Sequence, residues 1–316
     1  MAEIDSKFLQ EMVGSLGEFL SEDLKISRYR EYRLPVHFKA ENIRIAMEEW
    51  EWPKNPIFVV SYPKSGTTWT TEIIRQILYG RDENLDKISK SIPTPVIMLG
   101  IGIPEKKFDV IDRIPLPRKY FNTHLREELF DFEKLRKVNG KVIYVVRNPK
   151  DQLVSWYKFV HEILLNENVR KQLFKESWDD FFNDFLQGKH GLVSKDDEWS
   201  FPDHVKGWYK HRNDKDVLLL VYEDMIKDIN KEIRRIANFL EVDLTDKEIA
   251  IIAENTSIGS MKDAAGKSGR YEANILVNKG GVGKWKNKFS VAQSEQMDKV
   301  LKAEFADSDI EFTYQL

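Results

Sequence analysis

The sequence contains no cysteine, and this absence excludes several kinds of chemistry. None of the 316 residues can form a disulfide, bind a metal through a thiolate or act as a cysteine nucleophile. Long apolar runs are also missing, because no stretch approaches the roughly 18 residues that a membrane-spanning helix needs. The N-terminal residues 1–5 begin neither a basic region nor the apolar core of a secretory signal. We therefore expect a cytoplasmic protein without a membrane partner.

Charge of one sign is not in large excess either. The chain has 49 Lys and Arg against 52 Asp and Glu, so its net charge of −3 gives no general attraction for nucleic acid. Any anion site must depend on a local concentration of positive charge. With 41% hydrophobic residues and no repeat or linker, residues 1–316 are expected to form one domain.

The most informative segment, 62–69, reads Tyr-Pro-Lys-Ser-Gly-Thr-Thr-Trp. It joins a predicted strand at 57–60 to a predicted helix at 70–78. Such a turn directs backbone N–H groups and the positive end of a helix dipole to one place, which suits a phosphate. Gly66 allows a close backbone approach and Lys64 adds a charge. The alternative is an ordinary turn with a lysine; the Walker A pattern is not present.

Further apolar runs predict strands at 119–124, 141–147 and 217–222. Helices are predicted to follow the last two of them, with Pro149 at the first helical position after the strand 141–147. Near-continuous apolar strands that alternate with helices predict an α/β fold, with a central parallel sheet covered on both faces.

Two other stretches are expected to lie around this sheet. Residues 5–20 have apolar side chains at helical spacing, which predicts an amphipathic helix within an N-terminal extension and lead-in, 1–35. Residues 80–119 show little periodicity, and they are predicted to be a long irregular lid or binding loop. This stretch contains five prolines: Pro93, Pro95, Pro104, Pro115 and Pro117.

Polar candidates occur where the predicted strands end. The first strand ends in the Lys64 loop, the strand 141–147 ends in Arg147 with Ser155 eight residues on, and the strand 217–222 ends in Tyr222. Ligands of open parallel sheets bind beyond the carboxyl ends of the strands, so these groups are expected to converge. A guanidinium suits a second phosphate. The alternatives are a solvent-exposed charge for Arg147 and a helix-surface hydroxyl for Ser155.

These motifs, in this order, resemble the cytosolic sulfotransferase family from about residue 36 onward. The 62–69 loop is similar to the family's 5′-phosphosulfate loop, and 147–151 with Ser155 is similar to its 3′-phosphate motif. Three more segments match family motifs: 221–225, Asn255-Thr256-Ser257 and the glycine-rich 278–286.

The resemblance implies 3′-phosphoadenosine 5′-phosphosulfate as the donor and a small alcohol, phenol or amine as the acceptor, without a metal. It implies that the 5′-phosphosulfate is held by Lys64, Ser65, Gly66, Thr67 and Thr68. The adenine would contact Trp69, Tyr222 and Thr256, near Ser257 and Met261. The 3′-phosphate would be held by Arg147, Ser155, Lys279 and Gly280, with Asn278 beside them.

The resemblance also implies the catalytic groups. His124 matches the family's general base, which takes a proton from the acceptor, and Lys64 would stabilise the leaving oxygen. An apolar acceptor pocket is expected at Phe38, Val96, Met98, Phe159 and the segment 260–277.

The sequence departs from the family at two positions. Asn122 stands where Lys is usual, so a charge near the sulfuryl group is missing. Asn278 stands where Arg is usual, which costs about 1.5–3 kcal/mol of donor binding if nothing replaces that hydrogen bond. Two alternatives to a sulfotransferase follow: an ATP-dependent P-loop kinase, or a nucleotide-binding protein without turnover.

The segment 286–295 resembles the family's short dimerisation motif, with Ser290 in place of Thr. This similarity predicts a homodimer. The alternative is an N-capped helix start, because Ser290 and Gln293 have the spacing of a capping box. An interface of this size is small for a stable dimer, so a monomer is the other possibility.

Overall fold

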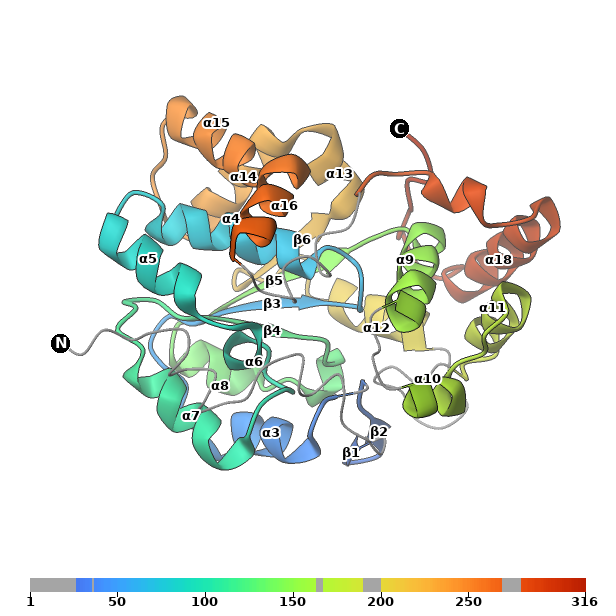
Figure 1. The fold of residues 1–316 in the computed structure, drawn as a ribbon, viewed down its shortest axis with the longest axis horizontal. Coiled ribbons are helices and arrows are strands. Elements are labelled where there is room, and N and C mark those ends of the chain that lie inside the picture. The colour runs from blue at the N-terminus through green and yellow to red at the C-terminus, as the bar shows by residue number, and fades with distance from the viewer. Residues whose placement is uncertain (1–26, 36, 163–166, 190–199, 269–279) are drawn as a thin grey trace.

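A four-stranded parallel sheet forms the centre of the protein (Figure 1). We describe a computed structural model of residues 27–316 without 36, 163–166, 190–199 and 269–279; the helix predicted at 5–20 lies outside these residues. The strand order is β4-β3-β5-β6. The strands are β3 (Ile57–Ser61), β4 (Tyr120–Thr123), β5 (Lys141–Val146) and β6 (Val217–Val221), and all neighbours are parallel. The predicted parallel α/β fold is confirmed.

Burial explains why these runs are strands. Every residue of β3 is buried, as are all residues of β4 and all but the first of β5. Parallel strands that are covered on both faces bury successive side chains, so their sequences are continuously apolar. Phe58 faces Trp52 and Phe130 on one side of the sheet, with ring centroids 4.6 and 5.2 Å away. Asn122 faces the opposite side, where it bonds to Thr71.

Helices surround the sheet on both faces and beyond one end of its strands. Figure 1 shows α9, α11 and α18 grouped beyond the carboxyl ends of the strands, where β3 leads into α4. The helices of the first half are α3 (Ala40–Arg44), α4 (Thr67–Tyr79), α5 (Glu83–Ser91), α6 (Thr94–Ile97), α7 (Pro104–Arg113), α8 (Phe132–Lys137) and α9 (Pro149–Glu162). Those of the second half are α10 (Glu167–Leu173), α11 (Trp178–Leu186), α12 (Ser200–Tyr209), α13 (Tyr222–Lys227), α14 (Ile229–Phe239), α15 (Asp246–Asn255), α16 (Ile258–Ser268) and α18 (Val291–Glu304).

Short elements complete the fold. A π-helical turn follows α3 at Ile45–Glu49, and 3-10 turns occupy Glu127–Leu129 and Lys284–Asn287. Strands β1 (Arg28–Tyr29) and β2 (Tyr32–Arg33) pair antiparallel. Within the described residues, no helix is long and apolar enough to cross a membrane. The same residues contain no group of three or more His, Cys, Asp or Glu arranged to hold a metal ion.

The prediction of a long irregular segment at 80–119 is wrong, because three helices lie there. Pro104 is the first residue of α7 and Pro95 lies in the first turn of α6. A proline is tolerated at these positions because the N–H that it lacks has no partner within the helix. The side chain of Asp82 caps α5 by accepting hydrogen bonds from two backbone N–H groups. Pro95 and Pro104 therefore lie at the starts of helices, whereas Pro115 and Pro117 follow the end of α7.

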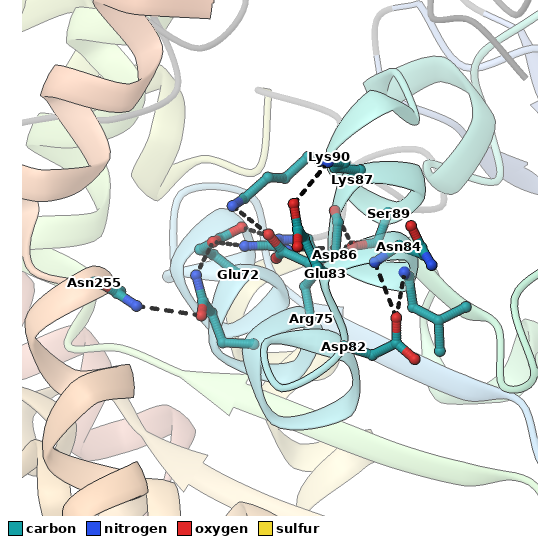
Figure 2. Close-up of polar contacts among 12 residues, drawn as sticks. Glu72, Arg75, Asp82, Glu83, Asn84, Asp86, Lys87, Ser89, Lys90 and Asn255 are labelled. Carbon is teal, nitrogen blue, oxygen red and sulfur yellow. Dashed lines mark hydrogen bonds and ion pairs between the residues drawn. The ribbon is translucent and has the colours of Figure 1, made fainter. Parts of the chain in front are cut away.

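An ionic cluster joins α5 to α4, the helix that follows the 62–69 loop (Figure 2). Its centre is Arg75, whose side chain is 5% exposed and lies 2.6 Å from Glu72 and 2.5 Å from Asp86. Ser89 accepts a further hydrogen bond from Arg75 at 3.2 Å. A buried guanidinium that is paired on both sides fixes the two helices relative to each other. The cluster therefore holds α4 against α5.

Candidate active site

The 62–69 loop lies at the carboxyl end of β3 and leads directly into α4. Gly66 is the N-cap of α4 and has a left-handed backbone, with φ of 114°. A Cβ atom at this position would lie 2.8 Å from the ring of Tyr222. Glycine is thus required at position 66 both by the backbone conformation and by the close approach of Tyr222. Lys64 is also left-handed, with φ of 70°.

Two buried polar atoms around this loop have no hydrogen-bond partner among the described residues. The hydroxyl of Ser65 is one, and the Nε of Arg147 is another. Ser65 is 1% exposed and Arg147 is 8% exposed. Unsatisfied buried donors carry a large free-energy cost, which an anion that accepts from them would remove. These orphaned donors fit a phosphate group.

The electrostatics of the loop also favour an anion. Burial, together with the nearby charges of Arg147 and Lys158, lowers the pKa of Lys64 to about 8. Its ammonium lies 4.5 Å from the ring centre of Phe159. The charged neighbours that shift this pKa, Arg147 and Lys158, are both cations, and they repel the Lys64 ammonium. A bound anion would relieve this repulsion.

Arg147 connects the ends of three strands, as the sequence predicts. It follows β5, and it donates hydrogen bonds to the backbone oxygens of Lys64 at 3.1 Å and Gly281 at 3.3 Å. Its guanidinium lies 4.4 Å from the ring centre of Tyr222, which follows β6. The alternative of a solvent-exposed charge does not hold, because Arg147 is buried.

Aromatic and hydroxyl groups lie beside this cationic centre. Trp69 packs edge-to-face on Tyr222, with ring centroids 5.6 Å apart, and its indole N–H donates to the backbone oxygen of Thr256 at 2.8 Å. The hydroxyl of Thr256 is already bonded to the carbonyl of Ile252. Gly280 is close by, because a Cβ there would lie 3.4 Å from the Tyr222 hydroxyl.

The remaining predicted donor residues differ in their exposure. Ser257 is exposed and bonded to Ser260, whereas Met261 and Ser155 are half-buried on α16 and α9. Thr67 and Thr68 form the first residues of α4, and Thr67 lies 2.6 Å from the Ser61 hydroxyl. Asn278 and Lys279 lie outside the described residues.

His124 follows β4, beside the end of β3. Its Nδ1 is 2.8 Å from the carbonyl oxygen of Ser61, so this nitrogen carries the proton and Nε2 has a free lone pair. Burial and the Lys64 charge together lower the pKa of His124 to about 4, although the hydrogen bond to Ser61 acts in the opposite direction. The imidazole is therefore neutral at pH 7 and can accept a proton at Nε2.

A second histidine, which the sequence does not indicate, supports this position. His204 is fully buried on α12, and its Nε2 donates to the backbone oxygen of His124 at 3.3 Å. The Tyr144 hydroxyl lies 3.0 Å from the other ring nitrogen of His204. The chain Tyr144–His204–His124 thus links β5 to the end of β4.

The Asn122 side chain is turned away from solvent. It is 4% exposed, and its side-chain amide lies 2.8 Å from the hydroxyl of Thr71 on α4. The amide thus ties β4 to the helix of the 62–69 loop. No positive charge is supplied from position 122.

Asp151 holds the glycine-rich C-terminal segment against the site. Its carboxylate accepts hydrogen bonds from the backbone N–H groups of Gly283 at 2.8 Å and Trp285 at 2.9 Å. Asn148 donates to the same carboxylate at 3.0 Å. This arrangement places Gly281 where Arg147 can reach it, and only the tertiary fold shows it.

Some of the predicted acceptor residues lie near His124. The Phe38 ring stacks on His124, with centroids 5.9 Å apart and planes 19° from parallel. Met98 is half-buried and bridges to Asn122 of β4. Val96 is 1% exposed within the apolar core. In the segment 260–277, residues 260–268 belong to α16 and the others lie outside the described residues.

A cavity of about 560 Å³ opens elsewhere, at the opposite edge of the sheet. It is lined by residues that precede or begin strands, among them Arg118, Lys141 and Asp216. None of the predicted site residues lines it. The carboxyl edge, with its unsatisfied donors, remains the candidate site.

Comparison with known proteins places the chain among sulfotransferases. A family model described as "Sulfotransferase domain" matches residues 54–309. The amine sulfotransferase of Oryctolagus cuniculus is 32% identical over 85% of this chain and 87% of its own length. Human sulfotransferase 2A1 is 32% identical over 85% of this chain and 91% of its own. The mouse sulfotransferase SULT7A1, solved in complex with PAP, has a TM-score of 0.71 and 30% identity, covering 90% of this chain and 95% of its own.

Proposed function

Because the chain belongs to the sulfotransferase family, we propose that it transfers a sulfuryl group from 3′-phosphoadenosine 5′-phosphosulfate to a hydroxyl or amine of a small apolar acceptor. The observation that carries this proposal is the convergence of Lys64, Arg147 and Tyr222 at one edge of the sheet. The similar mouse enzyme was solved with PAP, the desulfated product of this donor.

The donor-binding residues have separate tasks. The bound donor supplies an activated sulfuryl group next to a 5′-phosphate. The N-terminus of α4, the Ser65 hydroxyl and Lys64 would hold this end, because a helix start suits an anion and the Ser65 hydroxyl has no partner among the described residues. Arg147 would bind the 3′-phosphate with its free Nε, and Trp69 with Tyr222 would contact the adenine.

His124 would act as the general base. Its Nδ1 proton is held by the Ser61 carbonyl, so Nε2 is free to take the proton of the acceptor hydroxyl or amine. The Lys64 ammonium would offset negative charge on the leaving phosphate oxygen. Phe38, Met98 and Phe159 are the proposed apolar contacts for the acceptor.

Labelled donors test this function directly. The full-length protein is incubated with a panel of phenols, steroids, aliphatic alcohols and amines, together with either ³⁵S-labelled phosphosulfate donor or γ-³²P-ATP. We expect transfer of ³⁵S and none of ³²P. Transfer of ³²P would instead support a P-loop kinase, and donor binding without any product would support a nucleotide-binding protein without turnover.

We also propose a homodimer through 286–295, within one domain that comprises 1–316. Val291 is 76% exposed at the start of α18, which is unusual for a large apolar side chain. Ser290 and Gln293 form the capping box, so this feature is compatible with the dimer motif. Sedimentation velocity of Val291→Asp should show a shift from dimer to monomer, whereas a wild-type monomer contradicts the proposal. A cytoplasmic location stays a prediction.

A further inference from the structure

Lys107 on α7 is a buried cation in an unusual setting. Its side chain is 0% exposed. The ammonium donates hydrogen bonds to three backbone oxygens, those of Pro95, Met98 and Ile101, at 2.5–2.6 Å. An ammonium has three N–H donors, and all three are used here. Burial lowers the pKa of Lys107 well below its usual value, so the charged form depends on these three carbonyl dipoles.

A second buried side chain holds the same segment from the other side. Asn42 on α3 is 0% exposed, and its amide donates to the oxygens of Gly100 and Gly102 at 3.3 and 3.1 Å. The backbone N–H of Lys39 also donates to Gly100, at 2.7 Å. Residues 95–102 are thus tied by Lys107 from α7 and by Asn42 from α3.

The tied segment lies directly against the candidate acceptor site. The N–H of Leu99 donates to the oxygen of Asn122, two residues before His124. Gly100 is in close contact with the ring of Phe38, because a Cβ at position 100 would lie 2.0 Å from that ring. The Phe38 ring also stacks on His124. Phe38 therefore contacts both the tied segment and the proposed base.

From this arrangement we infer that Lys107 is a positioning residue for the acceptor: it fixes the 95–102 segment so that Gly100 seats Phe38 beside His124. The inference rests on the proposed function, since the acceptor site is defined by His124. In the described part of the chain, the hydrogen bonds of Lys107 go to Pro95, Met98 and Ile101, and none of these is a predicted donor residue. Replacing Lys107 should therefore weaken the binding of the acceptor and leave the binding of the nucleotide unchanged.

Kinetics of Lys107→Met test the inference, because methionine fills similar space without a donor. With 2-naphthol as acceptor, or another acceptor that the panel selects, the KM for the acceptor should rise at least tenfold. The KM for the donor and the Kd for PAP should stay within twofold of wild type. Lys106→Met, an exposed neighbour on α7, is the matched control and should behave as wild type. An unchanged acceptor KM in a variant that binds PAP overturns the inference.

Hydrogen exchange gives a readout that does not depend on turnover. In Lys107→Met the amide protons of Leu99 and Lys39 should exchange faster. The Leu99 amide lies in the tied segment and donates to Asn122, and the Lys39 amide donates to Gly100 of that segment. Unchanged exchange at both amides contradicts the inference. The proposed function fails in a different way, namely if the wild-type chain transfers no sulfate to any acceptor.

Gly100→Ala covers the case in which Lys107→Met does not fold. The added methyl group must displace the Phe38 ring while Lys107 stays intact. We expect the same rise in acceptor KM with unchanged PAP affinity. Combining it with Phe38→Ala removes the steric clash, so the two effects should be less than additive. An acceptor KM at the wild-type level in Gly100→Ala overturns the role of this contact.

Discussion

At the scale of single residues, the charge of Lys64 depends on what occupies the site. With a pKa of about 8, it is largely protonated at pH 7 and largely neutral at pH 9. Nucleotide binding should restore the usual, higher pKa, because phosphate favours the charged form. Proton uptake then accompanies binding at pH values above 8.

The first prediction follows from this linkage. The affinity for PAP should be nearly constant below pH 7 and about tenfold weaker at pH 9 than at pH 7, since only about one Lys64 in eleven is charged in the free protein at pH 9. Titration calorimetry at pH 7 and pH 9 measures the difference. Lys64→Met should bind more weakly and lose this pH dependence. Equal wild-type affinities at the two pH values would contradict the account.

The second prediction concerns His124, whose pKa of about 4 keeps it neutral at mildly acidic pH. The base function should be lost only as the pH approaches 4, where Nε2 gains a proton. Thus kcat/KM should stay nearly constant from pH 7 to pH 5. His124→Ala should lose turnover and keep PAP binding. A decline of wild-type kcat/KM with a midpoint near 6.5 would speak against the buried, neutral imidazole.

Single residues of the site could be predicted from sequence where they belong to a motif at a strand end. Lys64, Arg147 and Tyr222 do lie together, because parallel strands place their carboxyl ends at one edge. His204 and Lys107 could not be predicted. Their partners are 80 residues away or are backbone oxygens, and the sequence carries no signal for such contacts.

At the scale of elements, the turn from β3 into α4 is the part that tolerates least change. The third prediction is that Gly66→Ala weakens PAP binding at least tenfold, because its Cβ would meet Tyr222 and its backbone has φ of 114°. Titration calorimetry measures the loss. Gly266→Ala on α16 is the control, since nothing lies within 4 Å of its added Cβ. Wild-type affinity in Gly66→Ala would show that the loop does not hold the nucleotide.

The fourth prediction concerns the contact between α4 and α5. Arg75→Met should lower the free energy of unfolding by about 3 kcal/mol, because it leaves Glu72 and Asp86 without their buried partner. Lys87→Met breaks only an exposed pair on α5 and should cost less than about 1 kcal/mol. Urea denaturation measures both. Equal losses in the two variants would refute the role of the buried cluster.

Elements differ in how well sequence predicts them. The sequence predicts the four strands of the sheet within a residue or two of their ends, since burial on both faces favours runs of apolar residues. The sequence does not predict the helices at 83–113, because a proline can mark either the end or the start of a helix. In the structure, Asp82 caps the start of α5 and Pro104 is the first residue of α7.

At the scale of the whole molecule, the sheet collects groups from distant parts of the chain at one edge. Lys64 follows β3, His124 follows β4, Arg147 follows β5 and Tyr222 follows β6. Each strand is thus followed by one residue of the candidate site. The helices α3 and α7 would add the acceptor wall through Asn42 and Lys107.

A crystal structure of the full-length protein with PAP tests this account most directly. The account predicts one nucleotide whose 5′-phosphate lies on the 62–69 loop, whose 3′-phosphate is bonded to Arg147, and whose 5′ end is directed toward His124. A nucleotide in the cavity at the opposite edge of the sheet, or one that leaves Arg147 and Ser65 without a phosphate, would contradict it.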